Sequence, residues 1–293
     1  MHLETLKVFC DVVETRSFST AASQNFVTQS AVSQQIRMLE ERYGHRLLER
    51  MRGNVRLTPA GEIFYQASRD IVERYREMEA RLQTLTQVVA GTLRVATVHS
   101  IGLYELSRPI KRYLKAFPQV HLHLEYSRSN KIYEDALKGN VDLGIVAYPS
   151  RRPQITIVPF RQDRLVLVCP PGHPLARHRQ VSITKLAGEA MVGFERDIPT
   201  RKETDRILRR NGVDVRYVME LDNIETIKRV VEIGRGVALL PEPVVKPELR
   251  SKTLAVVHIS DETFLRPLGI IHRQGKHFSP AAAKFIEFLR AEG

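Results

Sequence analysis

The chain opens with apolar positions that recur at the spacing of an amphipathic helix. Over residues 3–15 these positions are Leu3, Leu6, Val8, Phe9, Val12 and Val13. After a break at residues 16–17, Ser19 is expected to cap a second short helix. A turn at residues 27–28 then leads into a third helix. Two short helices joined by a tight turn are typical of a helix-turn-helix.

The third helix, TQSAVSQQIRMLEERYG at residues 28–44, has an unusual polar face. Its apolar positions are Ala31, Val32, Ile36 and Leu39. Between them lie short hydroxyl and amide side chains and one arginine, namely Gln29, Ser30, Ser33, Gln34 and Arg37. Such side chains allow a helix to approach base edges in the major groove of DNA. The alternative is a solvated face in an ordinary three-helix bundle.

The next segment, HRLLERMRGNVRLTPAG at residues 45–61, reads as a β-hairpin with its turn at residues 52–54. Its basic side chains are Arg46, Arg50, Arg52 and Arg56. Arginine can follow phosphates or enter a narrow minor groove, so this hairpin is interpreted as a DNA-binding wing. Thr58 and Pro59 then have the residue types that cap and begin a new helix.

That helix is expected to continue to residue 89. Apolar residues recur every seven positions at Phe64, Ile71, Met78 and Leu85, and a second register adds Ala67, Tyr75, Leu82 and Val89. A seam kept over about four heptads predicts a dimerisation helix. The alternative is a helix that packs on its own domain.

From residue 91 onward, strands alternate with helices, which predicts parallel βαβ units. The order found over residues 92–149 recurs about a hundred residues later, over residues 190–241. Two similar α/β lobes in tandem leave a cleft at the carboxyl ends of their strands, where such sheets bind ligands. The last strand and helix are expected to return to the first lobe.

Two strand–helix junctions are expected to face that cleft. Ser100 and Gly102 follow the first strand of lobe 1, and Thr200 and Arg201 occupy the same place in lobe 2. Hydroxyls and free N–H groups at helix starts favour an anion. We therefore expect these residues to hold a carboxylate or similar group, with Ser129 and Asn130 at the rim. Alternatively, Ser100 and Thr200 serve only as helix caps.

Composition limits the class and the compartment of the protein but does not indicate its function. With 293 residues, 43% hydrophobic and 27% charged, the chain is globular and long enough for about two domains. It contains no apolar run long enough for a membrane span and no signal-peptide pattern, so a cytoplasmic location is expected. Cys10 and Cys169 both lie in apolar runs, which predicts buried, reduced thiols.

The net charge of +12 favours a polyanionic partner. Most of the excess positive charge lies after residue 89, away from the predicted helix-turn-helix. The total charge therefore does not locate the nucleic-acid-binding surface, and the local arrangement of side chains has to indicate it. No metal-ligand set, nucleophile elbow, Walker loop or dinucleotide fingerprint is present in the sequence. Neither catalysis, nor a metal, nor a cofactor is therefore expected.

Residues 3–61 resemble the winged helix-turn-helix of LysR-type transcriptional regulators. The resemblance rests on AA, SAVSQQIRMLE, LLER and LTPAG in this order and spacing; Leu48 departs from the phenylalanine usual in the family. It implies that one set of side chains faces DNA bases or backbone: Thr28, Gln29, Ser30, Ser33 and Gln34. It places a second set on phosphates or at the groove edge: Arg37, Arg50, Arg52 and Thr58.

Residues 92–293 resemble, with weaker motifs, the two-lobed periplasmic-binding-protein-like (type 2) α/β domain of the same regulators. The expected organisation is a DNA-binding domain (1–58), a linker helix (59–90) and an effector domain (91–293). Lobe 1 would comprise 91–161 and 266–293, and lobe 2 would comprise 162–265. The resemblance implies a regulator that binds a dyad-symmetric DNA operator and a small anionic effector, as a dimer that pairs into a tetramer. A solute-binding protein or an enzyme on the same fold is the alternative.

Overall fold

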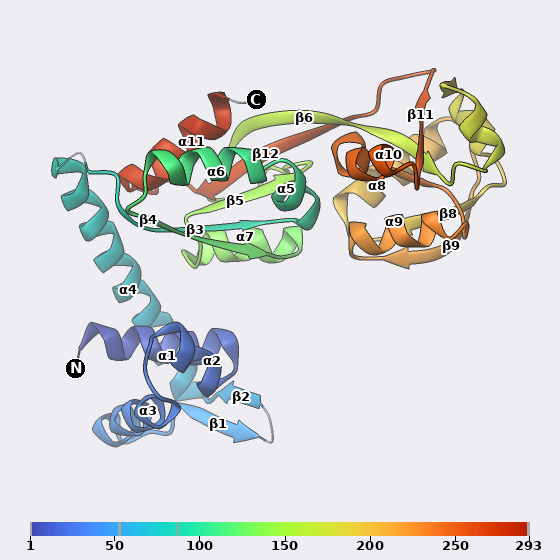
Figure 1. Cartoon of the computed structure of the whole chain (residues 1–293). Coiled ribbons are helices and arrows are strands. Elements are labelled where there is room, and N and C mark those ends of the chain that lie inside the picture. Colours follow the sequence, from blue (N-terminus) through green and yellow to red (C-terminus); the bar gives the residue numbers. More distant parts are fainter. Residues whose placement is uncertain (1, 52–53, 87, 292–293) are drawn as a thin grey trace. The chain divides into compact units, whose positions relative to one another are not determined.

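The structure is a computed structural model that describes residues 2–51, 54–86 and 88–291. It consists of two compact units, Met1–Thr86 and Gln87–Gly293 (Figure 1). The division falls a few residues before the boundary expected at residue 90. No helix among the described residues has the length and apolar content needed to cross a membrane.

The first unit is a small helical domain with a two-stranded hairpin. Its elements are α1 (Leu3–Thr15), α2 (Phe18–Gln24), α3 (Gln29–Tyr43), β1 (Leu48–Met51), β2 (Asn54–Leu57) and α4 (Pro59–Thr86). The core lies between α1, α3 and the start of α4, where the rings of Phe9 and Phe64 meet edge-on with centroids 5.1 Å apart. Strands β1 and β2 pair antiparallel. This order of elements confirms the predicted winged helix-turn-helix.

The start of α2 differs from the prediction. Ser17, not Ser19, is the N-cap, and its hydroxyl accepts a hydrogen bond from the backbone N–H of Thr20 at 3.2 Å. The helix already begins at Phe18, so Ser19 lies inside its first turn. Ser17 has the extended backbone that an N-cap needs, which the residue type alone did not distinguish from Ser19.

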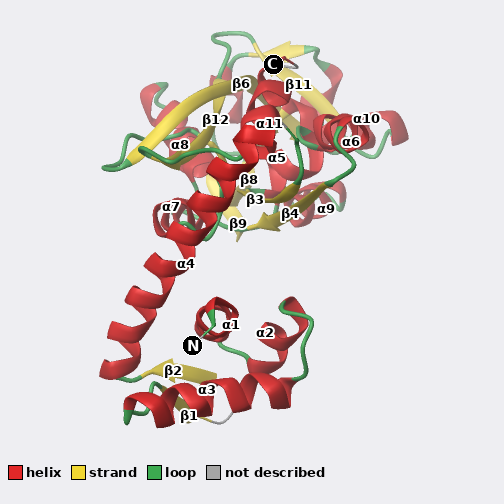
Figure 2. Cartoon of the chain, turned by 90° about the vertical axis from the view of Figure 1, so that its left-hand side faces the viewer, coloured by secondary structure: helices red, strands yellow, loops and turns green. Residues whose placement is uncertain are grey.

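Helix α4 runs unbroken over Pro59–Thr86 (Figure 2). Thr58 caps it as predicted, accepting a hydrogen bond from the N–H of Gly61 at 2.9 Å. Several predicted seam residues are exposed within the unit, namely Ile71, Tyr75, Met78 and Leu82. The prediction was wrong at its end, because the helix stops at Thr86 and Val89 packs on the core of the second unit. The side chain of Leu85 lies outside the described residues.

The second unit contains seven α-helices, three 3-10 helices and ten strands among its described residues. They are β3 (Gly91–Thr97), α5 (His99–Tyr104), α6 (Ser107–Ala116), β4 (Val120–Tyr126), α7 (Ser129–Lys138), β5 (Leu143–Ala147), β6 (Ile155–Cys169), η1 (Pro174–Arg177), β7 (Gln180–Val181), η2 (Ile183–Leu186), β8 (Ala190–Phe194), α8 (Pro199–Arg210), β9 (Arg216–Leu221), α9 (Ile224–Glu232), β10 (Ala238–Pro241), η3 (Glu242–Val245), α10 (Lys246–Ser251), β11 (Ala255–Ile259), β12 (Leu265–Arg273) and α11 (Pro280–Ala291).

The two lobes repeat one arrangement of strands. In lobe 1, β3 lies between β4 and β5, parallel to both, and β12 runs antiparallel beside β5. In lobe 2, β8 pairs parallel with β9, a parallel bridge joins Met191 to Val237 just before β10, and β10 runs antiparallel beside β6. The internal repeat read from the sequence is therefore confirmed. The carboxyl ends of β3 and β8 each lead into a helix.

Strand β6 was not predicted, and it connects the lobes. Up to Arg164 it pairs with β12 in lobe 1, and from Leu165 onward it pairs with β10 in lobe 2. The pairing therefore changes close to the lobe boundary expected at residues 161–162. In Figure 1, β6 and β12 run side by side between the two lobes.

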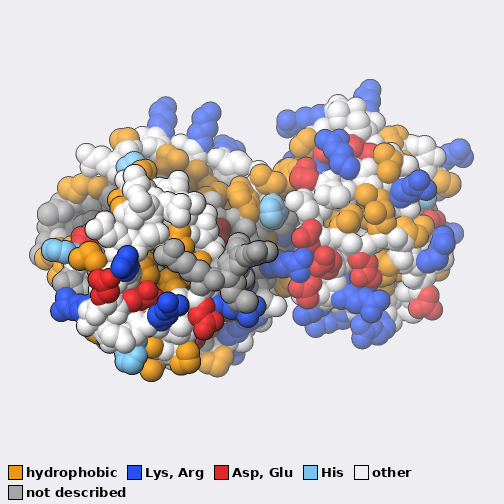
Figure 3. Space-filling view, turned by 90° about the horizontal axis from the view of Figure 1, so that it is seen from below, with side chains coloured by type: hydrophobic (Ala, Val, Ile, Leu, Met, Phe, Trp, Pro, Cys, Tyr) orange, Lys and Arg blue, Asp and Glu red, His pale blue; other side chains and the backbone are white. Residues whose placement is uncertain are grey.

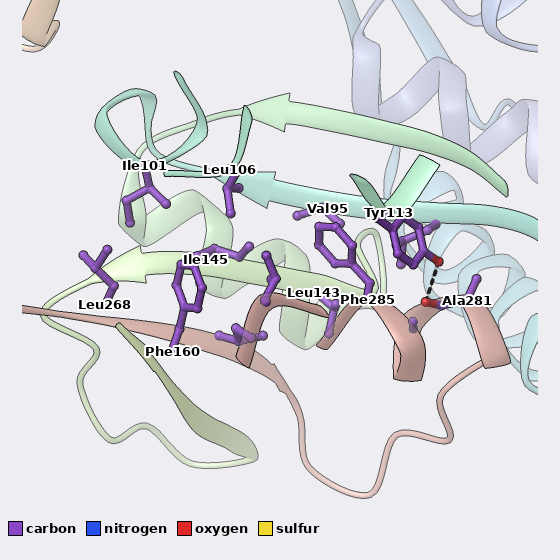
Figure 4. Packing of buried hydrophobic residues seen from close by; sticks show 14 of the residues in the cluster. Val95, Ile101, Leu106, Tyr113, Leu143, Ile145, Phe160, Leu268, Ala281 and Phe285 are labelled. Carbon is purple, nitrogen blue, oxygen red and sulfur yellow. Dashed lines mark hydrogen bonds between the residues drawn. The ribbon is translucent and has the colours of Figure 1, made fainter. Parts of the chain in front are cut away.

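The core of lobe 1 includes the C-terminal helix. Phe285 of α11 is fully buried and packs against Tyr113 of α6, with ring centroids 5.0 Å apart (Figure 4). The Tyr113 hydroxyl donates a hydrogen bond to the carbonyl of Ala281 at 2.8 Å. The return of the last strand and helix to the first lobe is confirmed.

Candidate DNA-binding surface and inter-lobe cleft

Helix α3 presents polar side chains from its first turns. Thr28 caps it by accepting a hydrogen bond from the N–H of Ala31 at 3.2 Å, and its hydroxyl lies 2.9 Å from that of Ser30. Gln29, Ser30 and Gln34 are exposed, whereas Ser33 is half-buried. On the opposite side, the three buried residues Val32, Ile36 and Leu39 hold the helix to the core.

Arg37 lies on the same exposed side, one turn after Ser33. Its Nε donates to the Oε1 of Glu41 at 2.8 Å, and both side chains are exposed. An exposed pair at this spacing contributes little to stability, so a phosphate can replace Glu41 at small cost.

A glutamate that the sequence reasoning missed fixes the hairpin to α3. The Oε1 of Glu40 accepts hydrogen bonds from the N–H groups of Leu47 at 2.8 Å and of Leu48 at 3.1 Å. Because the carboxylate holds two backbone donors at the start of β1, the wing has a set direction relative to α3. The sequence indicated this role only by the presence of an acidic residue on a helix whose exposed side chains otherwise suit contact with DNA.

The predicted groove-edge residues differ in how far the structure describes them. Arg50 lies in β1 opposite Val55. The side chain of Arg50, and Arg52 altogether, lie outside the described residues. The Thr58 hydroxyl donates to the carbonyl of Arg46 at 2.6 Å while it caps α4. Because this hydroxyl already makes two hydrogen bonds within the domain, the geometry supports a structural role for Thr58 rather than the predicted contact with DNA.

A cavity of about 320 Å³ lies between the two lobes. This volume is near the lower end of the range of roughly 300–1,000 Å³ for small-molecule sites. Four of the predicted effector residues line it: Ser100, Ser129, Asn130 and Thr200. Ser100 and Thr200 do not cap their helices, because Val98 and Ile198 hold the N-cap positions without side-chain bonds.

Arg201 does not line the cavity, which contradicts its predicted role. Its guanidinium is buried, donates to the carboxylate of Asp205 and to the carbonyl of Phe194, and lies 3.5 Å from the ring centroid of Tyr217. Burial opposes the charge of Arg201, yet the hydrogen bond to Asp205 and the charges of Tyr217, Asp205 and Glu220 raise its pKa. Arg201 therefore joins α8 to β8 and β9 instead of meeting a ligand.

Gly102 is not among the residues that line the cavity, so the geometry does not support its predicted contact with the effector. A Cβ at this position would meet the Cε1 of Tyr126 at 2.4 Å and the Cγ2 of Thr97 at 2.8 Å. The absence of a side chain lets the ring of Tyr126, which does line the cavity, pack against α5. Tyr126 also stacks on His99, another lining residue, with ring centroids 5.1 Å apart.

The strongest candidate ligand group is Arg266 on β12, which the sequence reasoning missed. It lines the cavity although only 1% of its surface is exposed. Its Nη2 donates to the Ser100 hydroxyl at 2.6 Å and its Nη1 donates to the Oδ2 of Asp163 at 2.7 Å. Its Nε is buried without a hydrogen-bond partner. A single arginine in the apolar run LRPLGII was the available signal.

Asp163, the partner of Arg266, is itself buried. Burial raises the pKa of its carboxyl to about 6, against the opposing attraction of Arg266. At neutral pH both side chains are therefore ionised, and the carboxylate of Asp163 largely balances the positive charge of Arg266. An anion in the cavity would find a guanidinium that is already oriented.

At the mouth of the cavity, one arginine bridges the two lobes. Arg128, which precedes α7 in lobe 1, contacts Glu195 at 2.8 Å, Asp222 at 3.2 Å and Asp197 at 3.4 Å, all in lobe 2. The hydrogen bonds to Asp222 and Glu195 raise the pKa of Arg128. In Figure 3, acidic side chains gather along the edge of the right-hand lobe that is nearer the other lobe.

Comparison with known proteins agrees with this architecture. The family model of the LysR substrate binding domain matches residues 86–293, and that of the bacterial regulatory helix-turn-helix of the lysR family matches residues 3–62. The RuBisCO operon transcriptional regulator of Allochromatium vinosum is 31% identical over 99% of this chain and 96% of its own length. The HTH-type transcriptional regulator CysL of Bacillus subtilis is 28% identical over 99% of this chain and 97% of its own length.

Solved structures share the fold over the whole chain. Full-length CbnR in complex with its target DNA superposes with a TM-score of 0.72 at 23% identity and covers 100% of both chains. A full-length OxyR variant from Pseudomonas aeruginosa superposes with a TM-score of 0.73 at 23% identity, and the match covers 99% of this chain and 94% of the OxyR chain. The curated relatives are regulators, not enzymes. The chain belongs to the LysR family of DNA-binding transcriptional regulators, with a winged helix-turn-helix domain followed by a two-lobed substrate-binding domain.

Proposed function

We propose that this regulator binds a dyad-symmetric DNA operator as a homodimer, which pairs into a tetramer, and that a small anionic metabolite in the inter-lobe cavity controls this binding. No metal or other cofactor is part of the proposal. A regulator of this kind works where the DNA is, so we place it in the cytoplasm.

The exposed polar face of α3 supports recognition of DNA. Glutamine can form two hydrogen bonds with adenine, and serine can bond to several base edges. Gln29, Ser30 and Gln34 are exposed at the start of the helix, which is the end that reaches bases in a helix-turn-helix. CbnR, which has the same fold, was solved with its target DNA.

The exposed seam of α4 supports dimerisation. Ile71, Met78 and Leu82 are each about half exposed within the unit, at 47%, 46% and 55%. Apolar residues at heptad spacing bury this surface when two such helices pair. A symmetric dimer presents two recognition helices, and these require two half-sites related by a dyad.

One observation carries the effector part of the proposal. The Nε of Arg266 is buried, has no hydrogen-bond partner and belongs to a residue that lines the cavity. An unpaired buried donor is costly, and an anionic group in the cavity would satisfy it. Ser100, whose hydroxyl accepts a hydrogen bond from the Nη2 of Arg266, and Thr200 also line the cavity and add polar groups to it.

Two measurements on the full-length protein test the proposal. DNA binding is followed by gel shift with dyad-symmetric and scrambled duplexes at two salt concentrations. We expect tight binding to the symmetric duplex and a steep loss of affinity as salt rises. Equal affinity for every duplex would contradict the proposed operator binding.

Thermal melts with small organic acids should show stabilisation that Arg266→Met abolishes and Thr200→Ala reduces. Stabilisation that neither change affects would contradict the effector site.

A further inference from the structure

The charges around the cavity are not those of a site built for a simple anion. Arg266 and Arg128 are the basic side chains among the described lining residues, and Asp197 and Asp222 are the acidic ones. Each arginine is already paired. Asp163 lies behind Arg266, and Glu195 is a third carboxylate on Arg128. Counting these partners, the site carries more negative than positive charge.

The two signs of charge lie at different places in the site. The buried end holds the unpartnered Nε of Arg266 beside the Ser100 hydroxyl. The mouth holds three carboxylates that share the single guanidinium of Arg128. Carboxylates in excess of their cations are stabilised by any further cation that enters between them.

We infer that the effector is a small zwitterion of the α-amino-acid class. Its carboxylate binds Arg266 and Ser100, and its ammonium group binds Asp197 and Asp222. This inference rests on the proposed function and refines it: the anionic group bound in the cavity is the carboxylate of a ligand that also carries an ammonium group.

A ligand whose charges are all of one sign fits only one end of this site. A dicarboxylate or an inorganic oxyanion would satisfy Arg266 but would lie close to Asp197 and Asp222, which repel it in a partly desolvated cavity. A simple amine would satisfy the two aspartates but would leave the Nε of Arg266 without a partner. Only a ligand with both groups meets both ends.

The rest of the lining limits the ligand's side chain. Apolar surface comes from Val98, Ala147, Phe194 and Ile224, while His99 and Tyr126 form a stacked pair. The cavity measures about 320 Å³. This space is sufficient for one amino acid.

The test is isothermal titration of the full-length protein, at a pH near 7.5, with the twenty proteinogenic L-amino acids. Each amino acid that binds is then compared with its 2-hydroxy-acid, which keeps the carboxylate and lacks the ammonium group, and with the corresponding amine. We expect at least one amino acid to bind, and its hydroxy-acid and amine to bind at least about tenfold more weakly.

Three variants assign the two ends. Asp222→Asn should weaken amino-acid binding about tenfold or more and leave or improve hydroxy-acid binding, because it removes one of the two carboxylates that bind the ammonium group, while Arg128 keeps Glu195 and Asp197 as partners. Arg266→Met should abolish binding of both. Asp214→Asn, an exposed aspartate of lobe 2 outside the cavity, is the matched control and should change neither.

The outcomes separate this inference from the proposed function. If hydroxy-acids or inorganic oxyanions bind as tightly as amino acids, and Arg266→Met still abolishes their binding, the zwitterion is wrong and the anion-controlled regulator stands. If no amino acid binds, the inference is overturned. A parallel gel shift with the dyad-symmetric duplex shows whether the same protein preparation still binds DNA.

Discussion

The ammonium group of Lys228 donates a hydrogen bond to the hydroxyl of Tyr104 at 2.6 Å and thereby joins α9 of lobe 2 to α5 of lobe 1. Lys228 is only 1% exposed. It also contacts the carboxylate of Glu248 at 2.8 Å and the carbonyl of Val244 at 3.1 Å. The lobes are therefore held together by a buried polar contact in addition to the Arg128 bridge at the cavity mouth.

Removing the charge of Lys228 should destabilise the second unit strongly. Lys228→Met leaves the buried carboxylate of Glu248 without its cation, which costs about 3–5 kcal/mol of the free energy of unfolding. Urea denaturation followed by circular dichroism measures it. The control is Lys284→Met, which breaks an exposed lysine–glutamate pair and should cost less than about 1 kcal/mol. Equal effects of the two changes would show that burial does not matter here.

A methyl group at Gly102 should damage the cavity more than the fold. Gly102→Ala places a Cβ 2.4 Å from a ring carbon of Tyr126, so this partly exposed ring, which lines the cavity, must shift from its position. We expect a loss of about 1–3 kcal/mol in the free energy of unfolding, with effector-dependent stabilisation abolished. Thermal melts with and without ligand measure both.

Gly172→Ala is the matched control for this change. Nothing lies within 4 Å of a Cβ at Gly172, so stability and ligand response should stay as in the wild type. If the Gly102 variant responds normally to ligand, Tyr126 is not a wall of the functional site.

The raised pKa of Asp163 predicts a specific pH dependence. Its value of about 6 in the folded protein lies above the ordinary 3.8, so the folded state holds this proton more tightly than the unfolded state does. The stability that this group contributes is complete below about pH 4 and is lost as the pH rises to about 6. Relative to Asp163→Asn, the wild type should therefore lose stability over this interval.

Chemical denaturation of both proteins at several pH values between about 4 and 7 checks this. The difference in their free energies of unfolding should fall up to about pH 6 and stay level above it. A difference that rises with pH would mean that the attraction of Arg266 outweighs the burial of Asp163.

Elements with a strong local pattern could be predicted from the sequence. The polar start of α3, the proline after Thr58 and the alternation of strands and helices each follow from spacing and residue type. Strand β6 was missed because its apolar and charged residues alternate only in part, and its pairing changes from one lobe to the other. That change depends on tertiary context, which no local pattern records.

The cavity was predicted in place but only partly in composition. Ser100 and Thr200 were found because they follow strands at a strand–helix junction. Arg201 has the same position in sequence, yet its partners Asp205 and Tyr217 turn it away from the cavity. Arg266 is far from these junctions along the chain, and only the pairing of β12 brings it beside Ser100.

The last prediction separates base reading from phosphate binding. Gln29 is exposed on the first turn of α3, and Arg52 belongs to the wing sequence. Gln29→Ala removes a side chain that can bond to a base, so it should change the preferred operator sequence at one position, by about 1–3 kcal/mol. Arg52→Ala removes the predicted phosphate contact, so it should weaken all duplexes alike and lower the salt slope by about one.

Gel shifts with a library of single-position operator variants, at two salt concentrations, measure both effects. Arg108→Ala, an exposed arginine on α6 of the second unit, is the control for loss of one positive charge and should change neither quantity. The two changes must act differently, because base contacts depend on sequence whereas phosphate contacts do not. If Gln29→Ala weakened every duplex equally, Gln29 would contact the backbone, and the side chains that read bases would have to lie elsewhere on α3.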